Sequence, residues 1–317
     1  MSKGKKFKHR NRQPQPPAHI QRPAVEVLPS LDLGFLNAAV ITPPEWKMAH
    51  IIVAGAGGIG SYLVQHIGRI MRVLYQSDKG CHLTICDPDV VEDQNIGRQL
   101  FCDAERGVPK AEALARRYGH AWGLNVTHFV GKYDESFLLG TDVTLLVGCV
   151  DNAAARQSLA QTLEHNPQDP EGQPSIFWLD CGNLRDTGRV LLGTDNEAAQ
   201  LRGAFPDAKH CLRLPSPALQ SPGLLEPQPE ELEGGCMSCA EMAAANLQSL
   251  NINARIAAEA ADMITRLLVT NDLKRFSCEV NLAAGSVRSY YSTPAEVARV
   301  IKQPMSYVRA QASAAVA

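Results

Sequence analysis

A glycine-rich turn between an apolar run and an amphipathic run is the feature that most limits what this chain can fold into. Residues 50–63 read HIIVAGAGGIGSYL. The apolar run predicts a buried strand, and the spacing of apolar residues from Ile59 to Leu74 predicts a helix. A turn of this kind lets the backbone close on a phosphate at the helix N-terminus. It therefore predicts a nucleotide site at its glycines, which are Gly55, Gly57, Gly58 and Gly60.

The region after this turn alternates strands with helices. Further strands are expected at HLTICD, NVTHFV, VTLLVGCVD and SIFWLDCG, and helices at KAEALARRYGHAW and NAAARQSLAQTLEH. Such alternation predicts an α/β fold, a Rossmann-like doubly wound and mainly parallel sheet with helices on both faces. Near the end of the chain, SCEVNLAAGSVRSYYS alternates on both sides of Ala284 and Gly285, which predicts a C-terminal antiparallel hairpin.

Composition divides the chain into three parts. Residues 1–47 are basic and then proline-rich, which predicts an N-terminal extension. Residues 48–270 hold the alternating pattern, interrupted at about 195–238 by a segment rich in Pro, Glu and Gly with little periodicity. A loop of that length inside a domain is typical of a functional or a disordered segment. Residues 271–317 hold the hairpin and a tail.

Cysteine usage predicts a cytoplasmic protein. The formal net charge is -2, and the nine cysteines are an odd number scattered along the chain. That usage is typical of free thiols in a reducing compartment. We find no run apolar enough to span a bilayer and expect no membrane association. We interpret the basic start as a solvated tail and do not expect it to bind nucleic acid.

Polar residues follow the predicted strands at the edge where ligands bind in open sheets. Asp87 ends the strand HLTICD, in the place of an acid that holds a ribose hydroxyl. Arg98 and Lys110 can balance phosphate charge, and Asp151, which follows VTLLVGCVD, can hold Mg²⁺. A triphosphate needs these charges, whereas a dinucleotide does not. The sequence has no GxxxxGK[ST] motif, so we do not expect a P-loop NTPase.

Together these motifs resemble the ThiF, MoeB and ubiquitin-activating enzyme superfamily. The matching segments are GAGGIG, DPD, NIGRQ, Lys110 and CVDNAAAR, which contains Asp151, Asn152 and Arg156. The match covers about residues 48–270. The C-terminal hairpin is similar to that of ThiF-family proteins of plasmid-borne PRTRC cassettes.

The resemblance implies adenylation by ATP of the C-terminal carboxylate of a small ubiquitin-like or sulfur-carrier protein that ends in glycine. It also implies a homodimer. The catalytic residues would be Arg98, Lys110, Asp151 and Cys239, with Asp151 as the metal ligand. The nucleotide would be bound by Gly55, Gly57, Gly58, Gly60, Asp87, Asp89, Asn95, Arg98, Gln99, Lys110 and Asn152.

The segment CMSC, Cys236 to Cys239, matches the family pattern in one respect and departs from it in another. Cys239 matches the sulfur-transferring cysteine of ThiF-like proteins, and its thiol could accept the acyl group or join a persulfide relay. Many relatives bind Zn²⁺ through two CxxC pairs, but here CMSC stands alone. Because structural zinc takes four ligands, we do not expect a complete zinc site; only Cys211 or Cys278 could supplement the pair.

Two other interpretations remain open. An NAD-dependent oxidoreductase would share the glycine turn, but it would need an acid–base pair and a substrate pocket in the second half of the chain. An inactive adaptor half of an activating complex would share the fold, but it would not need the full set of polar residues at the strand ends.

Overall fold

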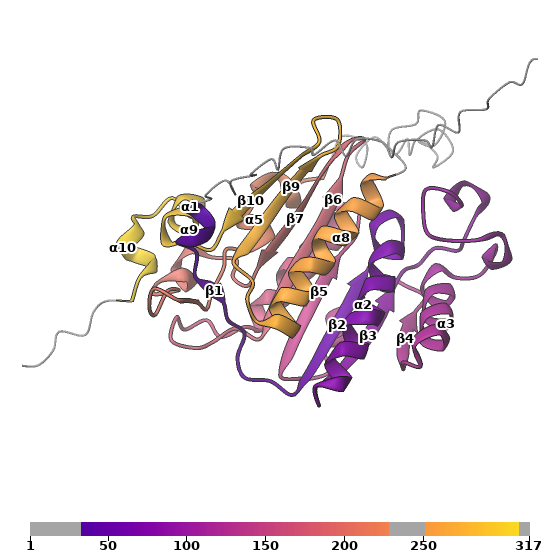
Figure 1. The fold of residues 1–317 in the computed structure, drawn as a ribbon, viewed down its shortest axis with the longest axis horizontal. Coiled ribbons are helices and arrows are strands. Elements are labelled where there is room, and N and C mark those ends of the chain that lie inside the picture. Colours follow the sequence, from indigo (N-terminus) through magenta and orange to yellow (C-terminus); the bar gives the residue numbers. More distant parts are fainter. Residues whose placement is uncertain (1–32, 228–250, 311–317) are drawn as a thin grey trace, which may run out of the picture. The chain divides into compact units, whose positions relative to one another are not determined.

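The computed structural model of this chain describes residues 33–227 and 251–310 (Figure 1). All of them belong to one unit of the chain, which begins at Leu33. None of the helices in the described part has the length and apolar character needed to cross a membrane.

A single large sheet organises these residues. Its central strands β6, β5, β2, β3 and β4 run parallel, and β7, β9 and β10 extend it in antiparallel fashion. The predicted fold class is therefore confirmed. In spatial order the strands are β10 (Ser286–Tyr291), β9 (Arg275–Asn281), β7 (Thr187–Gly193), β6 (Ile176–Asn183), β5 (Val143–Gly148), β2 (Met48–Ala54), β3 (Gly80–Cys86) and β4 (Val126–Phe129).

Helices lie on both faces of the sheet. Figure 1 shows α2 (Gly58–Gln76), α3 (Lys110–Trp122) and α8 (Ile252–Thr265) on the near face. The other face is covered by α4 (Ala153–Thr162) and α5 (Pro217–Gln220). The remaining helices are α1 (Leu33–Leu36), α9 (Pro294–Val300), α10 (Met305–Val308), the π-helix η7 (Arg266–Thr270) and the 3₁₀ helices η1 (Asp93–Asn95), η2 (Asp103–Glu105), η3 (Glu135–Phe137), η4 (Leu163–His165), η5 (Ala198–Leu201) and η6 (Pro222–Leu225).

The continuous apolar run of β2 follows from burial on both faces. Side chains alternate across a strand, so Ile51 and Val53 join the core cluster beneath α2 and α8. Ile52 and Ala54 join the cluster on the opposite face, with Trp178. The apolar residues at consecutive positions 51–54 thus supply both clusters, as expected for a central parallel strand.

Two segments that the sequence set apart from the central region pack onto it. Ile41 and Trp46, within the predicted N-terminal extension, are buried. The short strand β1 (Val40–Ile41) pairs with β8 (His210–Cys211) of the aperiodic segment. The C-terminal hairpin continues the large sheet, because β9 pairs with β7. The three predicted parts of the chain and the boundaries between them stay predictions.

A buried ion pair lies within the aperiodic segment and joins it to the loop before β6. Arg213 and Asp195 are 1% and 0% exposed, and a guanidinium nitrogen of Arg213 donates to Asp195 Oδ1. The other terminal nitrogen, Nη2, donates to three backbone carbonyls, those of Pro167, Asp169 and Gly172, at 2.6–2.8 Å. This arginine therefore joins the two parts of the aperiodic segment that carry Asp195 and Arg213 to the loop at residues 167–172.

Candidate functional site

The glycine turn lies between β2 and α2, where the order of the strands reverses. Gly55 has φ +93°, a conformation that other residues rarely adopt. A Cβ at Gly60 would lie 2.0 Å from Gly55 O, so the backbone itself occupies that space. Gly57, the N-cap residue of α2, has no side chain that could bond the amides of the first turn, and amides in this position suit an anion.

Asp87 follows β3 and joins the glycine turn to the next segment. Its carboxylate accepts hydrogen bonds from the N–H groups of Ala56 at 2.6 Å and of Asp89 at 2.8 Å. Burial raises the pKa of Asp87, and these two hydrogen bonds together with the charge of Lys110 oppose the rise. The end of β4 also lies beside Asp87, because Asp87 N donates to Phe129 O and Gly131 N donates to Asp87 O.

Lys110 begins α3 and pairs with Asp89. Its Nζ lies 2.8 Å from Asp89 Oδ2, and the lysine side chain is 7% exposed while the aspartate side chain is 63% exposed. Lys110 N also donates to Asp89 O at 2.9 Å. The ammonium is thus held at the edge of the sheet beside Asp87, with a partner that faces solvent.

The segment that carries Asn95, Arg98 and Gln99 packs against the start of α2. Asn95 is buried and its Oδ1 accepts from Glu92 N at 2.9 Å, which caps η1. Arg98 is half-buried, and its Nε donates to Gln94 O at 3.2 Å. Gln99 is buried beside Gly57, and its Oε1 has no hydrogen-bond partner within the described ranges. An unsatisfied buried amide oxygen at a helix N-terminus is a polar group that a ligand can satisfy.

Asp151 lies three residues beyond the end of β5 and is exposed. Asn152, next to it, caps α4: its Oδ1 accepts from Ala155 N at 2.9 Å, and its Nδ2 donates to Asp151 Oδ1 at 3.3 Å. The turn before them contacts the glycine turn, since the Cβ position of Gly55 is 2.5 Å from Cys149 O. The structure therefore brings the glycine turn, Asp87, Lys110 and the turn that carries Asp151 to one edge of the sheet.

Sequence reasoning missed Asp180 and gave Arg156 no role. Asp180 lies in β6 with a fully buried side chain, and Arg156 Nε is 3.2 Å from its Oδ1. Burial raises the pKa of Asp180, while the neighbouring Arg156 lowers it. The signal in the sequence was an acid inside an otherwise apolar strand, IFWLDCG, since buried acids need a partner.

The cysteines divide between described and undescribed residues. Cys236 and Cys239 lie outside the described residues, so the predicted thiol role stays a prediction. Cys211 and Cys278 are buried, and burial raises the pKa of both thiols, that of Cys278 to about 12. Within residues 33–227 and 251–310, no three His, Cys, Asp or Glu side chains gather to hold a metal.

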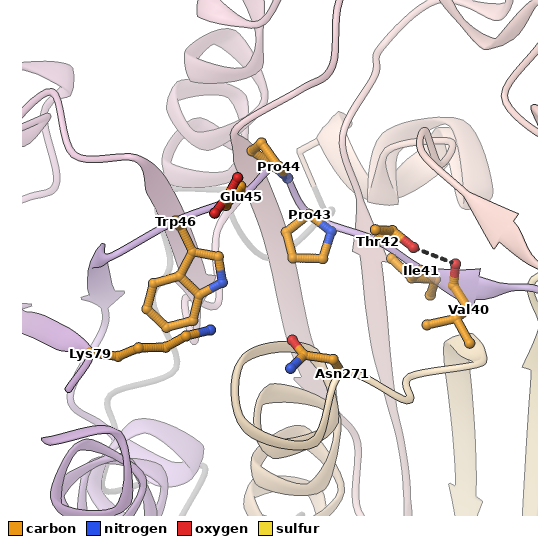
Figure 2. Close-up of a pocket in the computed structure, with 9 residues that line it drawn as sticks. All are labelled: Val40, Ile41, Thr42, Pro43, Pro44, Glu45, Trp46, Lys79 and Asn271. Atoms are coloured by element: carbon orange, nitrogen blue, oxygen red, sulfur yellow. Dashed lines mark hydrogen bonds between the residues drawn. The ribbon is translucent and has the colours of Figure 1, made fainter. Parts of the chain in front are cut away.

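A pocket of ~340 Å³ lies at the opposite edge of the sheet, where β2 and β3 begin (Figure 2). Lys79 Nζ lies 3.9 Å from the ring centre of Trp46, and Thr42 Oγ1 donates to Val40 O at 3.1 Å. None of the residues predicted to bind nucleotide lines it. It is a separate feature from the polar edge.

Comparison with known proteins identifies the family. The model of the ThiF family matches residues 44–211, more than half of the chain. The adenylyltransferase and sulfurtransferase UBA4 of Yarrowia lipolytica is 33% identical over 145 residues, which are 42% of this chain and 34% of that protein. The chain thus spans about a third of this curated relative.

Solved structures of E. coli MccB are similar in fold. MccB with ATP is 14% identical, with a TM-score of 0.50 over 78% of this chain and 66% of that chain. MccB with AMPCPP and MccA is also 14% identical, with a TM-score of 0.48 over 77% and 64% of the two chains. The match of the family model over more than half of the residues gives the assignment: the chain belongs to the ThiF family.

Proposed function

We propose that this protein is an ATP-dependent adenylyltransferase that activates the C-terminal carboxylate of a small ubiquitin-like or sulfur-carrier protein. The observation that carries the proposal is the meeting of an uncapped helix N-terminus, buried Asp87 and Lys110 at one sheet edge. The printed name of the relative UBA4 includes adenylyltransferase, and MccB has been solved with ATP and with AMPCPP.

The nucleotide would lie across the end of β3. The first-turn amides of α2 suit the phosphates, and Asp87 suits the ribose hydroxyls. Phe129 and Val130, which are 41% and 49% exposed, follow directly on the side of Asp87 away from the glycine turn. An adenine ring would cover this apolar surface.

The reaction needs charge stabilisation more than acid–base chemistry. A carboxylate oxygen of the carrier attacks the α-phosphorus of ATP, and the bond to the β-phosphate oxygen breaks, giving an acyl-adenylate and pyrophosphate. The attacking carboxylate is already ionised near pH 7. The barrier lies in the charge that builds on pyrophosphate, which Lys110 and Arg98 would balance.

Asp151 would hold a Mg²⁺ that arrives with the triphosphate. Mg²⁺ bound to ATP takes one or two protein carboxylates besides phosphate and water oxygens. One exposed carboxylate at the sheet edge therefore fits this role, and the ion would supply charge neutralisation of the leaving group.

The finer assignments rest on the family resemblance. The thiolate of Cys239 would attack the acyl carbon of the adenylate, forming a thioester and releasing AMP; alternatively, Cys239 would join a persulfide relay, whose outer sulfur a sulfane-sulfur donor must supply. We propose a homodimer and, by the similarity of the hairpin, a protein of the PRTRC-cassette type. The carrier would end in glycine, because a narrow tail can reach the α-phosphate beside the glycine turn.

Calorimetry with ATP, with and without Mg²⁺, and with NAD tests the nucleotide assignment. ATP is expected to bind and NAD is not. Binding of NAD together with no binding of ATP would overturn the proposal in favour of an oxidoreductase.

ATP–pyrophosphate exchange with a ubiquitin-fold protein ending in Gly-Gly tests the chemistry. Asp151→Ala is expected to lower the exchange rate by a factor of about 10² to 10³. Cys239→Ala is the matched variant: it should leave exchange intact and remove a reducible adduct between enzyme and carrier on a non-reducing gel. Normal exchange in Asp151→Ala would contradict the proposed role of that residue.

A further inference from the structure

The turn that carries Asp151 is held by an arginine from the following helix. Arg156 lies in the first half of α4, and its Nη2 donates to Val150 O at 2.7 Å. On the N-terminal side of the turn, Cys149 N donates to Ala54 O at 2.8 Å and so extends the pairing of β5 with β2. The backbone just before Asp151 is thus fixed by contacts to two different elements.

Arg156 is itself oriented by a buried acid one strand away. Its Nε lies 3.2 Å from Asp180 Oδ1, and the two side chains are 14% and 0% exposed. Asp180 Oδ2 has no hydrogen-bond partner among the described residues. A buried carboxylate with one free oxygen is costly to keep, so it is a poor device for stability alone. Its contact with Arg156 orients the planar guanidinium whose Nη2 donates to Val150 O.

We propose that Arg156 and Asp180 are positioning residues that fix the turn at residues 149–152 and so preorganise the exposed carboxylate of Asp151. The inference rests on the proposed function, because it assigns these residues to the same adenylation site. Neither residue touches the nucleotide; both act through the backbone of the turn. A carboxylate whose backbone is already fixed loses less conformational entropy when it binds a metal ion, which is the general advantage of a preorganised site.

Amide hydrogen exchange tests the structural half of the proposal without any substrate. In Arg156→Ala, the peptide spanning residues 149–156 is expected to exchange about tenfold faster, since a charge-assisted hydrogen bond to the turn is lost. Arg189→Ala is the matched control. Arg189 also contributes charge near Asp180, but it donates to Ser221 Oγ rather than to the turn. Unchanged exchange in Arg156→Ala would overturn the proposal.

The affinity for ATP with and without Mg²⁺ tests the functional half. Arg156→Ala and Asp180→Asn are expected to keep the affinity for metal-free ATP and to lose about tenfold of the gain that Mg²⁺ gives to the wild type. Asp151→Ala should lose the whole gain in ATP affinity that Mg²⁺ gives, and Arg189→Ala should show the same gain as the wild type. Asp180→Asn preserves side-chain volume, so it serves if Arg156→Ala folds poorly.

The outcomes separate this inference from the proposed function. If the wild type binds no ATP, the proposed function fails, and the positioning role fails with it. If the wild type binds ATP but Arg156→Ala and Asp180→Asn keep the full gain from Mg²⁺, the pair is structural and only the positioning role is overturned. Lower affinity for metal-free ATP in both variants would also contradict positioning, since it would mean a general loss of the site.

Discussion

The polar edge of the sheet and the packed segment at 195–227 each contain a lysine or arginine paired with an aspartate, but the two pairs differ in burial. Lys110 is buried while its partner Asp89 faces solvent. Arg213 and Asp195 are both buried, and Arg213 also serves three carbonyls. A charge whose partner faces solvent can exchange that partner for a ligand, whereas a pair sealed from solvent can only hold structure.

Breaking the buried pair of Arg213 and Asp195 is expected to have the largest effect on the free energy of unfolding. Arg213→Ala leaves a buried carboxylate and three carbonyls without their donor, and we expect the free energy of unfolding to fall by about 3–5 kcal/mol. Urea denaturation followed by circular dichroism measures it. The double variant Arg213→Met/Asp195→Leu removes both charges and should recover part of the loss. A fall below about 1 kcal/mol in the single variant would contradict the comparison.

Breaking the Lys110–Asp89 pair, in which only the lysine is buried, should lower the activity and leave the free energy of unfolding nearly unchanged. Lys110→Ala leaves Asp89 hydrated, so the free energy of unfolding should fall by no more than about 1 kcal/mol. ATP–pyrophosphate exchange should fall by a factor of about 10² to 10³, the usual effect of removing one such charge from a reacting site. Lys79→Ala, at the opposite edge beside Trp46, is the control. Equal effects of the two substitutions on exchange would show that Lys110 is not part of the site.

A buried histidine that has no ion-pair partner in the described part of the chain extends the comparison to pH. His50 lies in β2, its Nε2 is 2.9 Å from Thr84 Oγ1, and its Nδ1 has no partner within the described residues. Burial, with a smaller contribution from His82, lowers the pKa of His50 from 6.5 to about 4. Between these values the unfolded chain binds the proton more readily, so stability is complete above pH 6.5 and is lost as pH falls towards 4.

The free energy of unfolding lost through His50 between pH 6.5 and 4 amounts to at most about 3 kcal/mol. Thermal unfolding of the wild type and of His50→Gln between pH 4 and 7 measures it. The difference between the two curves should shrink as pH falls, because only the wild type carries this proton uptake. Parallel curves would show that His50 is not the group responsible.

An ion pair with both partners in water gives the smallest expected effect. Arg106 lies 2.6 Å from Asp103 and 2.9 Å from Asp93, and all three side chains are more than half exposed. Arg106→Ala should change the free energy of unfolding by no more than about 0.5 kcal/mol. A loss as large as that of Arg213→Ala would show that burial does not rank these pairs.

The sequence predicted those parts whose signal is local. The helix at Lys110–Trp122 was predicted with its observed limits, because Pro109 precedes it and Gly123, with φ +62°, ends it. The glycine turn and Asp87 were predicted for a similar reason: the strand, the turn and the helix are consecutive in the chain. Their placement at one sheet edge then follows from the parallel order of the strands.

What the sequence could not predict depends on contacts between distant residues. Arg156 meets Asp180, and Arg213 meets Asp195, only after strands and loops have assembled. The segment after Asp195 was predicted as an aperiodic loop, yet Leu201, Phe205 and Leu214 in it are buried. Its elements are too short to repeat a period, so burial there leaves no pattern that a sequence alone can display.

The close contacts of the glycine turn determine which Gly→Ala substitutions can be compensated by a substitution elsewhere in the protein. A Cβ at Gly58 would meet the side chain of Asn253 at 2.7 Å, so a smaller residue at position 253 could act as an intragenic suppressor of Gly58→Ala. A Cβ at Gly60 would meet the backbone of Gly55, which no change of side chain can remove. A selection for revertants would therefore return second-site suppressors for Gly58→Ala and only restored glycine for Gly60→Ala.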